Sequence, residues 1–302
     1  MPSRPADLPG LAGWASDDAA ESLTAYLATV DSAGPSWPRP SPGQEPRAFF
    51  ETAFRLSAPQ GEPGWLTGYF EPEFEAALCR DDRHHWPLHA CPPDLAADRP
   101  WYSRTEIEAG GLLAGRELAW LADPLDAFLA QVQGSVRLRM TDGRLLRLGY
   151  AGRNGHPYRS IGAELVARGI APAAEMTLDH IRQWARDHAE EVPDLLRLNP
   201  SYVFFRPIDL PPDLGPIGAM GQPLVAGRSL AADPDLIPPG APVWVSALGR
   251  LMVAQDRGSA IRGPNRGDVF CGSGPEAGLR AGRLRARGHL RPLLPAGPET
   301  AR

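Results

Sequence analysis

Residues 254–274, AQDRGSAIRGPNRGDVFCGSG, hold two aspartates, Asp256 and Asp268, twelve positions apart. Five glycines lie between and after them, and glycine lets the backbone approach a ligand closely. The apolar run Leu251–Ala254 predicts a strand that delivers Asp256 to an exposed end. Two acids on a glycine-lined wall suit acid–base chemistry on an oxygen leaving group.

Two simpler interpretations of these aspartates remain open at this point. An aspartate in a glycine-rich loop is often a turn residue whose side chain bonds its own backbone. Asp256-Arg257-Gly258-Ser259 is also similar to the D-[TS]-G loop of aspartic proteases. That loop needs a hydroxyl residue where Arg257 stands and a second loop of its kind, which the sequence lacks.

Short motifs outside this stretch occur in a fixed order along the chain. They are GYFEP at 68–72, DAF at 126–128, QVQGS at 131–135, GRNGHPYRSIG at 152–162, NPSYVFF at 199–205, GPIGA at 215–219 and AGRSL at 226–230. Together with 254–274 they resemble the membrane-bound lytic murein transglycosylase A family, whose C-terminal "3D" region is named for its aspartates. Each motif is weak alone, and their order over about residues 65–295 makes the resemblance specific.

The resemblance implies a mainly β protein built as a double-psi β-barrel with a second small β-rich domain inserted. We expect a lead and linker at 1–45, the barrel at 46–108 and 200–302 with its 3D region at 215–295, and the insert at 109–199. Sugar would lie in a groove between the two domains, where ligand sites commonly occur.

The implied activity is cleavage of the β-1,4 bond between N-acetylmuramic acid and N-acetylglucosamine in peptidoglycan, with 1,6-anhydro ends formed. Asp268 is the expected general acid/base and Asp256 the supporting carboxylate, with the reverse assignment as the alternative. The glycan strands are the expected partner, alone or within a cell-wall synthesis complex. Expected substrate contacts are Tyr69, Glu71, Gln133, Gly134, Asn154, Tyr158, Ser229 and Gly258.

Four positions depart from the family pattern, namely Val136, Val225, Ser259 and Cys271. The two aspartates are retained, so these departures bear on substrate preference rather than on the chemistry. The competing functions are a non-catalytic, expansin-like wall-binding protein and a β-glucanase on a similar barrel. The motifs around Gln133 and Asn154 favour the transglycosylase, because they have no reason to recur in expansins.

Composition excludes several classes of protein. The net charge of −5 over 302 residues argues against a nucleic-acid binder. All 31 basic residues are arginine, so a Schiff-base lysine and a P-loop lysine are excluded. His84, His85, His89 and Cys91 lack the spacing of a zinc site. We therefore expect no metal and no cofactor.

Cysteine content and the N-terminus bear on location. Three cysteines cannot form a full set of disulfides; Cys79 and Cys91 pair across a hairpin or stay thiols like Cys271. The first residues show no apolar signal region and no lipoprotein cysteine. The family resemblance nevertheless implies the periplasm or the outer membrane.

Local patterns predict individual elements. Leu23, Leu27 and Val30 predict a helix in an otherwise poorly constrained lead, and 47–56 predicts a second helix. Strands are expected at 65–74, 243–245, 251–254 and 289–294, and a hairpin turn at 141–143. Helices are expected at 161–167 and after Thr177 as the N-cap.

Overall fold

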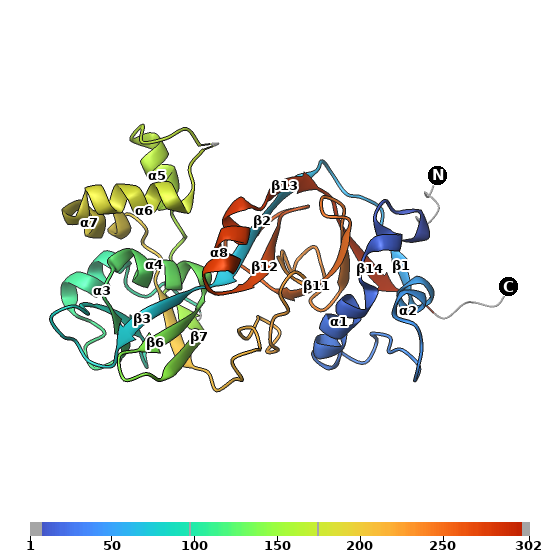
Figure 1. The fold of residues 1–302 in the computed structure, drawn as a ribbon, viewed down its shortest axis with the longest axis horizontal. Coiled ribbons are helices and arrows are strands. Elements are labelled where there is room, and N and C mark those ends of the chain that lie inside the picture. Colours follow the sequence, from blue (N-terminus) through green and yellow to red (C-terminus); the bar gives the residue numbers. More distant parts are fainter. Residues whose placement is uncertain (1–7, 97, 174, 298–302) are drawn as a thin grey trace. The chain divides into compact units, whose positions relative to one another are not determined.

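The structure is a computed structural model that describes residues 8–96, 98–173 and 175–297 (Figure 1). The chain forms two compact units. Unit 1 holds the described residues of Met1–Phe70, Pro212–Gly272 and Leu279–Arg302, and unit 2 holds Glu71–Pro211 and Ser273–Gly278. Most of unit 2 is thus one stretch set between two parts of unit 1. The domain boundaries expected from the resemblance stay a prediction.

Unit 1 is built on an eight-stranded sheet of order β1-β14-β10-β11-β9-β12-β2-β13. Strand β9 runs parallel to β11 and antiparallel to β12. The elements in unit 1, some of which extend past its boundary, are η1 (Leu8–Gly10), η2 (Trp14–Ser16), α1 (Ala19–Ala33), α2 (Pro46–Ala53), β1 (Phe54–Leu56), β2 (Gly64–Glu71), β9 (Ser229–Ala232), β10 (Pro242–Val245), β11 (Arg250–Asp256), β12 (Gly267–Ser273), α8 (Gly274–Arg283), β13 (Arg285–Gly288) and β14 (Leu290–Pro295).

The core of unit 1 includes the N-terminal helix α1, which lies alongside β11 (Figure 1). Tyr26 is fully buried and packs against the rings of Phe49, Phe50 and Phe54. The Ser22 hydroxyl donates to the carbonyl of Leu251 at 3.0 Å. The expectation of a poorly constrained lead is therefore wrong for α1, because its aromatic face completes the core of the sheet.

Unit 2 has three layers. Its six-stranded sheet has the order β4-β5-β3-β6-β7-β8, and α4 packs on it through Ala127 and Ala130. The other side of α4, with Leu125 and Phe128, packs on α5, α6 and α7 (Figure 1). The elements are β3 (Glu73–Ala77), β4 (Trp86–His89), α3 (Arg104–Gly110), β5 (Glu117–Leu121), α4 (Pro124–Gln133), β6 (Ser135–Met140), β7 (Leu145–Arg153), α5 (Ile161–Ala167), α6 (Leu178–Asp187), η3 (Ala189–Glu191), α7 (Val192–Arg197) and β8 (Val203–Pro207).

Most of the predicted elements are confirmed. The strands β10, β11 and β14, the β6–β7 hairpin and α5 lie where the patterns place them, and Thr177 caps α6 by accepting from the His180 amide. Two predicted elements are divided. The helix expected at 47–56 ends at Ala53, because the next residues pair with β14 as strand β1. The strand expected at 65–74 is broken at Pro72 into β2 and β3.

Candidate active site

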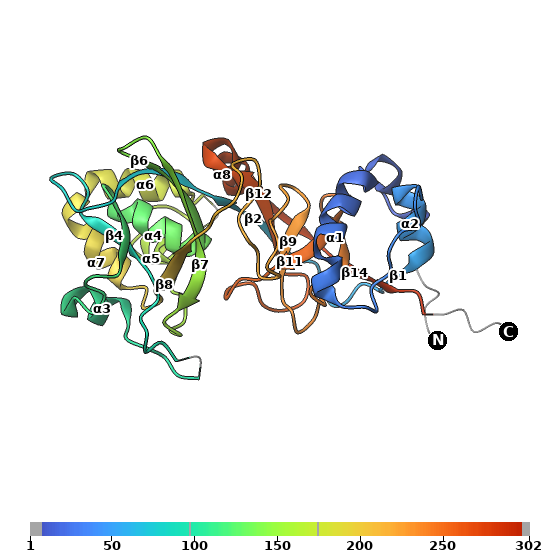
Figure 2. The same ribbon diagram turned by 90° about the horizontal axis from the view of Figure 1, so that it is seen from below.

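Asp256 and Asp268 lie on the two strands that flank β9 (Figure 2). Each is the register partner of the same residue, Ala231. Residues in register on neighbouring strands face the same side of a sheet, and strands lie 4.7–4.9 Å apart. The two side chains therefore share one face, with their Cα atoms about 10 Å apart.

A β-bulge sets the register of Asp256. The pairing of β11 with β9 shifts between Ala254 and Asp256, so Gln255 is the extra residue. Its buried amide donates to the Ala25 carbonyl at 3.0 Å and accepts a hydrogen bond from the Ser229 hydroxyl. The inward-facing Gln255 thus fixes the bulge, and Asp256 is left on the same face as Asp268.

The carboxylate of Asp256 accepts hydrogen bonds from a side chain and from the backbone. The Tyr69 hydroxyl donates at 2.7 Å and the backbone N–H of Ala219 at 3.0 Å. Burial raises the pKa of Asp256, while both hydrogen bonds oppose that rise. Burial and the neighbouring Asp256 raise the pKa of Tyr69 well above its ordinary value. Tyr69 is therefore a fixed hydrogen-bond donor to this carboxylate.

Asp268 is the second acid of the site. Burial raises its pKa to about 6, against the lowering effects of a hydrogen bond from Thr67 and the charge of Arg266. Thr67 Oγ1 donates to Asp268 Oδ1 at 2.7 Å. Asp256 also raises this pKa, but it is the smallest of the causes. Burial, rather than the second acid, is what favours a protonated carboxyl here.

Sequence reasoning missed Thr67. Strand alternation places Trp65, Thr67 and Tyr69 on one face of β2, and Thr67 and Tyr69 each hold one of the two aspartates. Thr67 lies two residues before Tyr69 in a predicted strand, and this spacing could have indicated that both face the site. The two contacts themselves join residues 201 and 187 positions apart, so no local pattern reveals them.

A third aspartate, Asp233, follows β9 and holds the glycine-rich loop that precedes β12. Its carboxylate accepts from the Gly263 N–H at 2.8 Å and from Arg262 at 3.0 Å. The Gly263 N–H is the main cause that lowers the pKa of Asp233. In the same loop, a Cβ on Gly258 would lie 2.8 Å from the Ile261 side chain. Gly258 keeps the backbone after Asp256 closely packed.

Three further predicted contacts are buried and internally bonded. Asn154 in unit 2 donates to the carbonyls of Tyr102 and Pro200, both at 2.8 Å, and accepts from the Tyr202 N–H at 2.9 Å. Ser229 in unit 1 makes the hydrogen bonds described above. Glu71, with 1% of its surface exposed, pairs with two arginines. Their roles toward a sugar stay predictions.

The remaining predicted contacts reach the surface of unit 2. Gln133 is the last residue of α4, and Gly134 caps the helix with φ 78° and an N–H bonded to the Ala130 carbonyl. Tyr158 is 38% exposed. Since Gly134 has open space where a Cβ would lie, the turn leaves room for a ligand beside the helix end. Binding by these residues also stays a prediction.

The histidines named as metal candidates have other partners. His84 contacts Asp81 at 2.9 Å, and His89 contacts the Tyr202 hydroxyl at 2.9 Å. Within the described ranges, no three His, Cys, Asp or Glu side chains converge as a metal site would require. Cys79, Cys91 and Cys271 are free thiols. In the same part of the chain, no helix has the length and apolar character to cross a bilayer.

Comparisons with known proteins agree with this architecture. The MltA specific insert domain matches residues 65–206, and the 3D domain matches residues 228–294. The two matches define a class of proteins in which a 3D domain is combined with the MltA specific insert domain. The chain belongs to the membrane-bound lytic murein transglycosylase A family.

Individual relatives show how far the similarity extends. The Escherichia coli membrane-bound lytic murein transglycosylase A is 40% identical over 232 residues, which cover 72% of this chain and 62% of that protein. The chain thus spans less than two thirds of this curated relative. The crystal structure of the Agrobacterium tumefaciens membrane-bound lytic murein transglycosylase has a TM-score of 0.78 at 32% identity and covers 96% of both chains. Escherichia coli MltA with bound chitohexaose has a TM-score of 0.77 at 32% identity, covering 92% of this chain and 90% of that one.

Proposed function

We propose that this protein is a lytic transglycosylase that cleaves the MurNAc-β-1,4-GlcNAc bond of peptidoglycan and leaves 1,6-anhydro ends. The observation that carries the proposal is the Asp268 carboxyl, which is partly buried, held by Thr67 and has a pKa of about 6. A carboxyl with this pKa can donate a proton near neutral pH. Family membership and the chitohexaose bound to Escherichia coli MltA support a glycan as the substrate.

In the proposed reaction, Asp268 protonates the glycosidic oxygen as the bond to the muramyl C1 breaks. The C6 hydroxyl of the same muramyl residue forms the new bond to C1, and the Asp268 carboxylate then takes the O6 proton. No water is consumed. The nucleophile is already attached to the substrate, so proximity replaces a second activating group.

The weak effect of Asp256 on the pKa of Asp268 fits a mechanism with a single catalytic carboxyl. A retaining hydrolase places its two carboxyl groups about 5–5.5 Å apart. At that distance each charge would strongly change the pKa of the other, yet Asp256 contributes least to the pKa of Asp268. We assign Asp256, held by Tyr69, to orienting the substrate rather than to covalent catalysis.

We also propose the type of barrel, the domain boundaries and the cellular location. The sheet of unit 1 is proposed to form the double-psi β-barrel, with the 3D region at 215–295 as its catalytic part and the insert at 109–199. Tyr69 and Gly258 are proposed sugar contacts beside the acids, and Gln133, Gly134 and Tyr158 are proposed contacts on unit 2. The relatives are named membrane-bound, which supports action at the periplasm or outer membrane.

The products test the reaction class. Digested sacculi are expected to release anhydro-muropeptides about 18 Da lighter than hydrolysed ends, because no water is added. Mass spectrometry of the released fragments measures this difference. Hydrolysed ends would instead support a glucanase-type hydrolase with the same two acids, and the absence of cleavage by folded protein would support an expansin-like binder.

Thr67 and Asp256 have opposite effects on the pKa of Asp268, so replacing them should change the pH dependence of activity in opposite directions. Thr67→Val removes a hydrogen bond that lowers the Asp268 pKa, so the basic limb of kcat/KM should move to higher pH. Asp256→Asn removes a small raising effect, so that limb should move down by about one pH unit at most. Profiles of kcat/KM against pH on soluble glycan strands measure both. A larger downward change in Asp256→Asn would make the acid pair, rather than burial, the cause of the raised pKa.

A further inference from the structure

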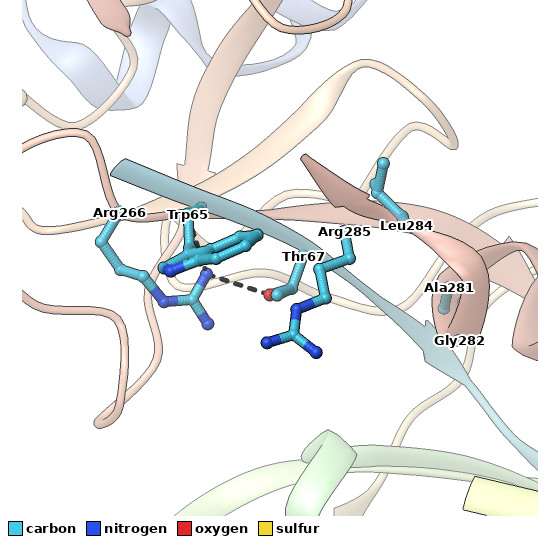
Figure 3. A pocket seen from close by; sticks show the side chains of 7 residues that line it. All are labelled: Trp65, Thr67, Arg266, Ala281, Gly282, Leu284 and Arg285. Atoms are coloured by element: carbon cyan, nitrogen blue, oxygen red, sulfur yellow. Dashed lines mark hydrogen bonds between the residues drawn. The ribbon is translucent and has the colours of Figure 1, made fainter. Parts of the chain in front are cut away.

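A pocket of about 360 Å³ opens beside Thr67 in unit 1 (Figure 3). Its polar wall comes from Trp65 and Thr67 on β2, Arg285 on β13 and Arg266 ahead of β12. The guanidinium groups of Arg266 and Arg285 lie on the same side of β2 as the Trp65 ring (Figure 3). Ala281, Gly282 and Leu284 complete the lining.

The sheet places Arg285 in this pocket and Arg287 beside it. Arg285 is the register partner of Thr67, and Arg287 is the register partner of Trp65. Their guanidinium carbons lie 4.8 Å and 5.6 Å from the centre of the Trp65 ring. Stacking on an indole orients a guanidinium and leaves N–H groups for a ligand, and Arg287 is held further by donating to the Pro63 carbonyl at 2.8 Å. Trp65 is 44% exposed, so the ring is a platform at the surface rather than a core residue.

The charge of Arg266 lowers the pKa of Asp268, which is an acid beside this pocket. Among residues 8–96, 98–173 and 175–297, no carboxylate forms an ion pair with Arg266, Arg285 or Arg287. The chain as a whole carries a net charge of −5, so three unpaired arginines around one tryptophan are a local exception. A planar guanidinium matches a carboxylate through two parallel hydrogen bonds.

The pocket is joined to the proposed catalytic acid by one side chain. Arg266 donates to Thr67 Oγ1 at 2.9 Å, and Thr67 donates to Asp268 at 2.7 Å. The Thr67 side chain would therefore lie between Asp268 and a group bound by Arg266 and Arg285. A substituent on the sugar that is being cleaved could occupy this position.

We propose that the pocket lined by Trp65, Arg266 and Arg285, with Arg287 beside the same indole ring, binds a carboxylate carried by the glycan substrate. The inference rests on the proposed function and adds a preference to it, for strands that carry acidic substituents over neutral ones. The carboxylate belongs either to the lactyl group of a muramyl residue that lacks a stem peptide or to the stem peptide itself, which is attached to the lactyl group through an amide. Both share the same charge and geometry, and the choice of probe distinguishes them.

The test compares native glycan strands with strands whose carboxylates have been converted to amides. Wild type is expected to show a higher kcat/KM on native strands. In the double variant Arg285→Gln/Arg287→Gln, the ratio of the two values should fall roughly three- to thirty-fold. Arg55→Gln is the matched control, because Arg55 is exposed on β1 at the opposite end of the strand order, and it should keep the wild-type ratio.

Two further arms make the result specific. Strands stripped of stem peptides expose the lactyl carboxylate, which is bound as an amide in peptide-bearing strands. A preference for these stripped strands over their amidated form assigns the pocket to the lactyl group, and its absence assigns the pocket to the peptide. Arg285→Lys/Arg287→Lys keeps the charge without the planar fork and should give an intermediate ratio. An equal ratio in wild type and double variant would overturn the inference. Loss of anhydro products in wild type itself would instead overturn the proposed function.

Discussion

Asp268→Asn protein is expected to lose about 10²–10⁴-fold in kcat while unfolding at a higher temperature than wild type at pH 7. Asparagine preserves the shape and can still accept from Thr67, but it cannot donate and recover a proton. Release of anhydro-muropeptides measures the first effect, and calorimetry measures the second. A folded Asp268→Asn protein with near-wild-type activity would move the acid to Asp256.

The expected gain in stability follows from the direction of the pKa change. The folded state raises the pKa of Asp268 from 3.8 to about 6, so it binds the proton more tightly than the unfolded chain does. Folding is thus favoured at low pH, and this contribution is lost as the pH rises through about 6. At 1.36 kcal/mol per unit, the ionised carboxyl costs up to about 3 kcal/mol at neutral pH.

Asp233→Asn is the matched control, with the opposite sign. The Gly263 N–H is the main cause that lowers the pKa of Asp233, so its charged form stabilises the fold above the unfolded pKa and loses that effect in acid. Replacing Asp233 should lower the unfolding temperature at pH 7. Opposite effects of two Asp→Asn changes, one in β12 and one just after β9, would separate a catalytic acid from a structural one.

Glu71→Ala is expected to destabilise the fold by about 3–5 kcal/mol, because it leaves buried arginines without their counter-charge. Glu71 accepts from Arg137 at 2.6 Å, from Arg147 at 3.1 Å and from the Ser273 hydroxyl at 2.7 Å. Arg147 itself has only 4% of its side chain exposed. The unfolding temperature should fall by roughly 10 °C or more.

The control for this change is Glu73→Ala, two residues along the chain. Glu73 pairs with Arg139, whose side chain is 67% exposed, and such surface pairs contribute at most about 1 kcal/mol. Calorimetry on both variants and on Glu71→Gln measures the contrast. If Glu71→Gln kept the wild-type unfolding temperature but weakened glycan binding, Glu71 would be a substrate contact rather than a structural acid.

The sequence predicts the parts of the site that are local. The apolar run before Asp256 predicts a strand that ends at this acid, and β11 ends there. The strand β12 that carries Asp268 was not predicted. The sequence does not reveal Thr67 and Tyr69 as hydrogen-bond donors to the two acids, because those contacts depend on how β2 aligns with distant strands. The ion pairs of Glu71 are hidden for the same reason, since Arg137 and Arg147 lie 66 and 76 positions away.

The N-terminal helix α1 shows a second limit of prediction from sequence, which concerns tertiary packing. Its apolar residues were visible in the sequence, but the surrounding Pro/Gly-rich segments suggested a loose lead. Whether an amphipathic helix is anchored depends on the surface it meets, and α1 meets the aromatic side chains of α2 and β1. Local propensity predicts the helix, and only tertiary packing decides that it belongs to the core.

The β-bulge at Gln255 depends on the side chain of that residue as well as on the count of residues before Asp256. Ala254 pairs with Leu230 and Asp256 with Ala231, so deleting Gln255 would leave the carboxylate opposite Ala231 but would remove the buried amide that bonds Ala25 and Ser229. Natural or engineered length changes should therefore be tolerated in the exposed stretch around Ser259 and Ala260, and excluded between Val253 and Asp256. Relatives with diverged residues in β11 can still preserve the site, provided that the extra residue is kept.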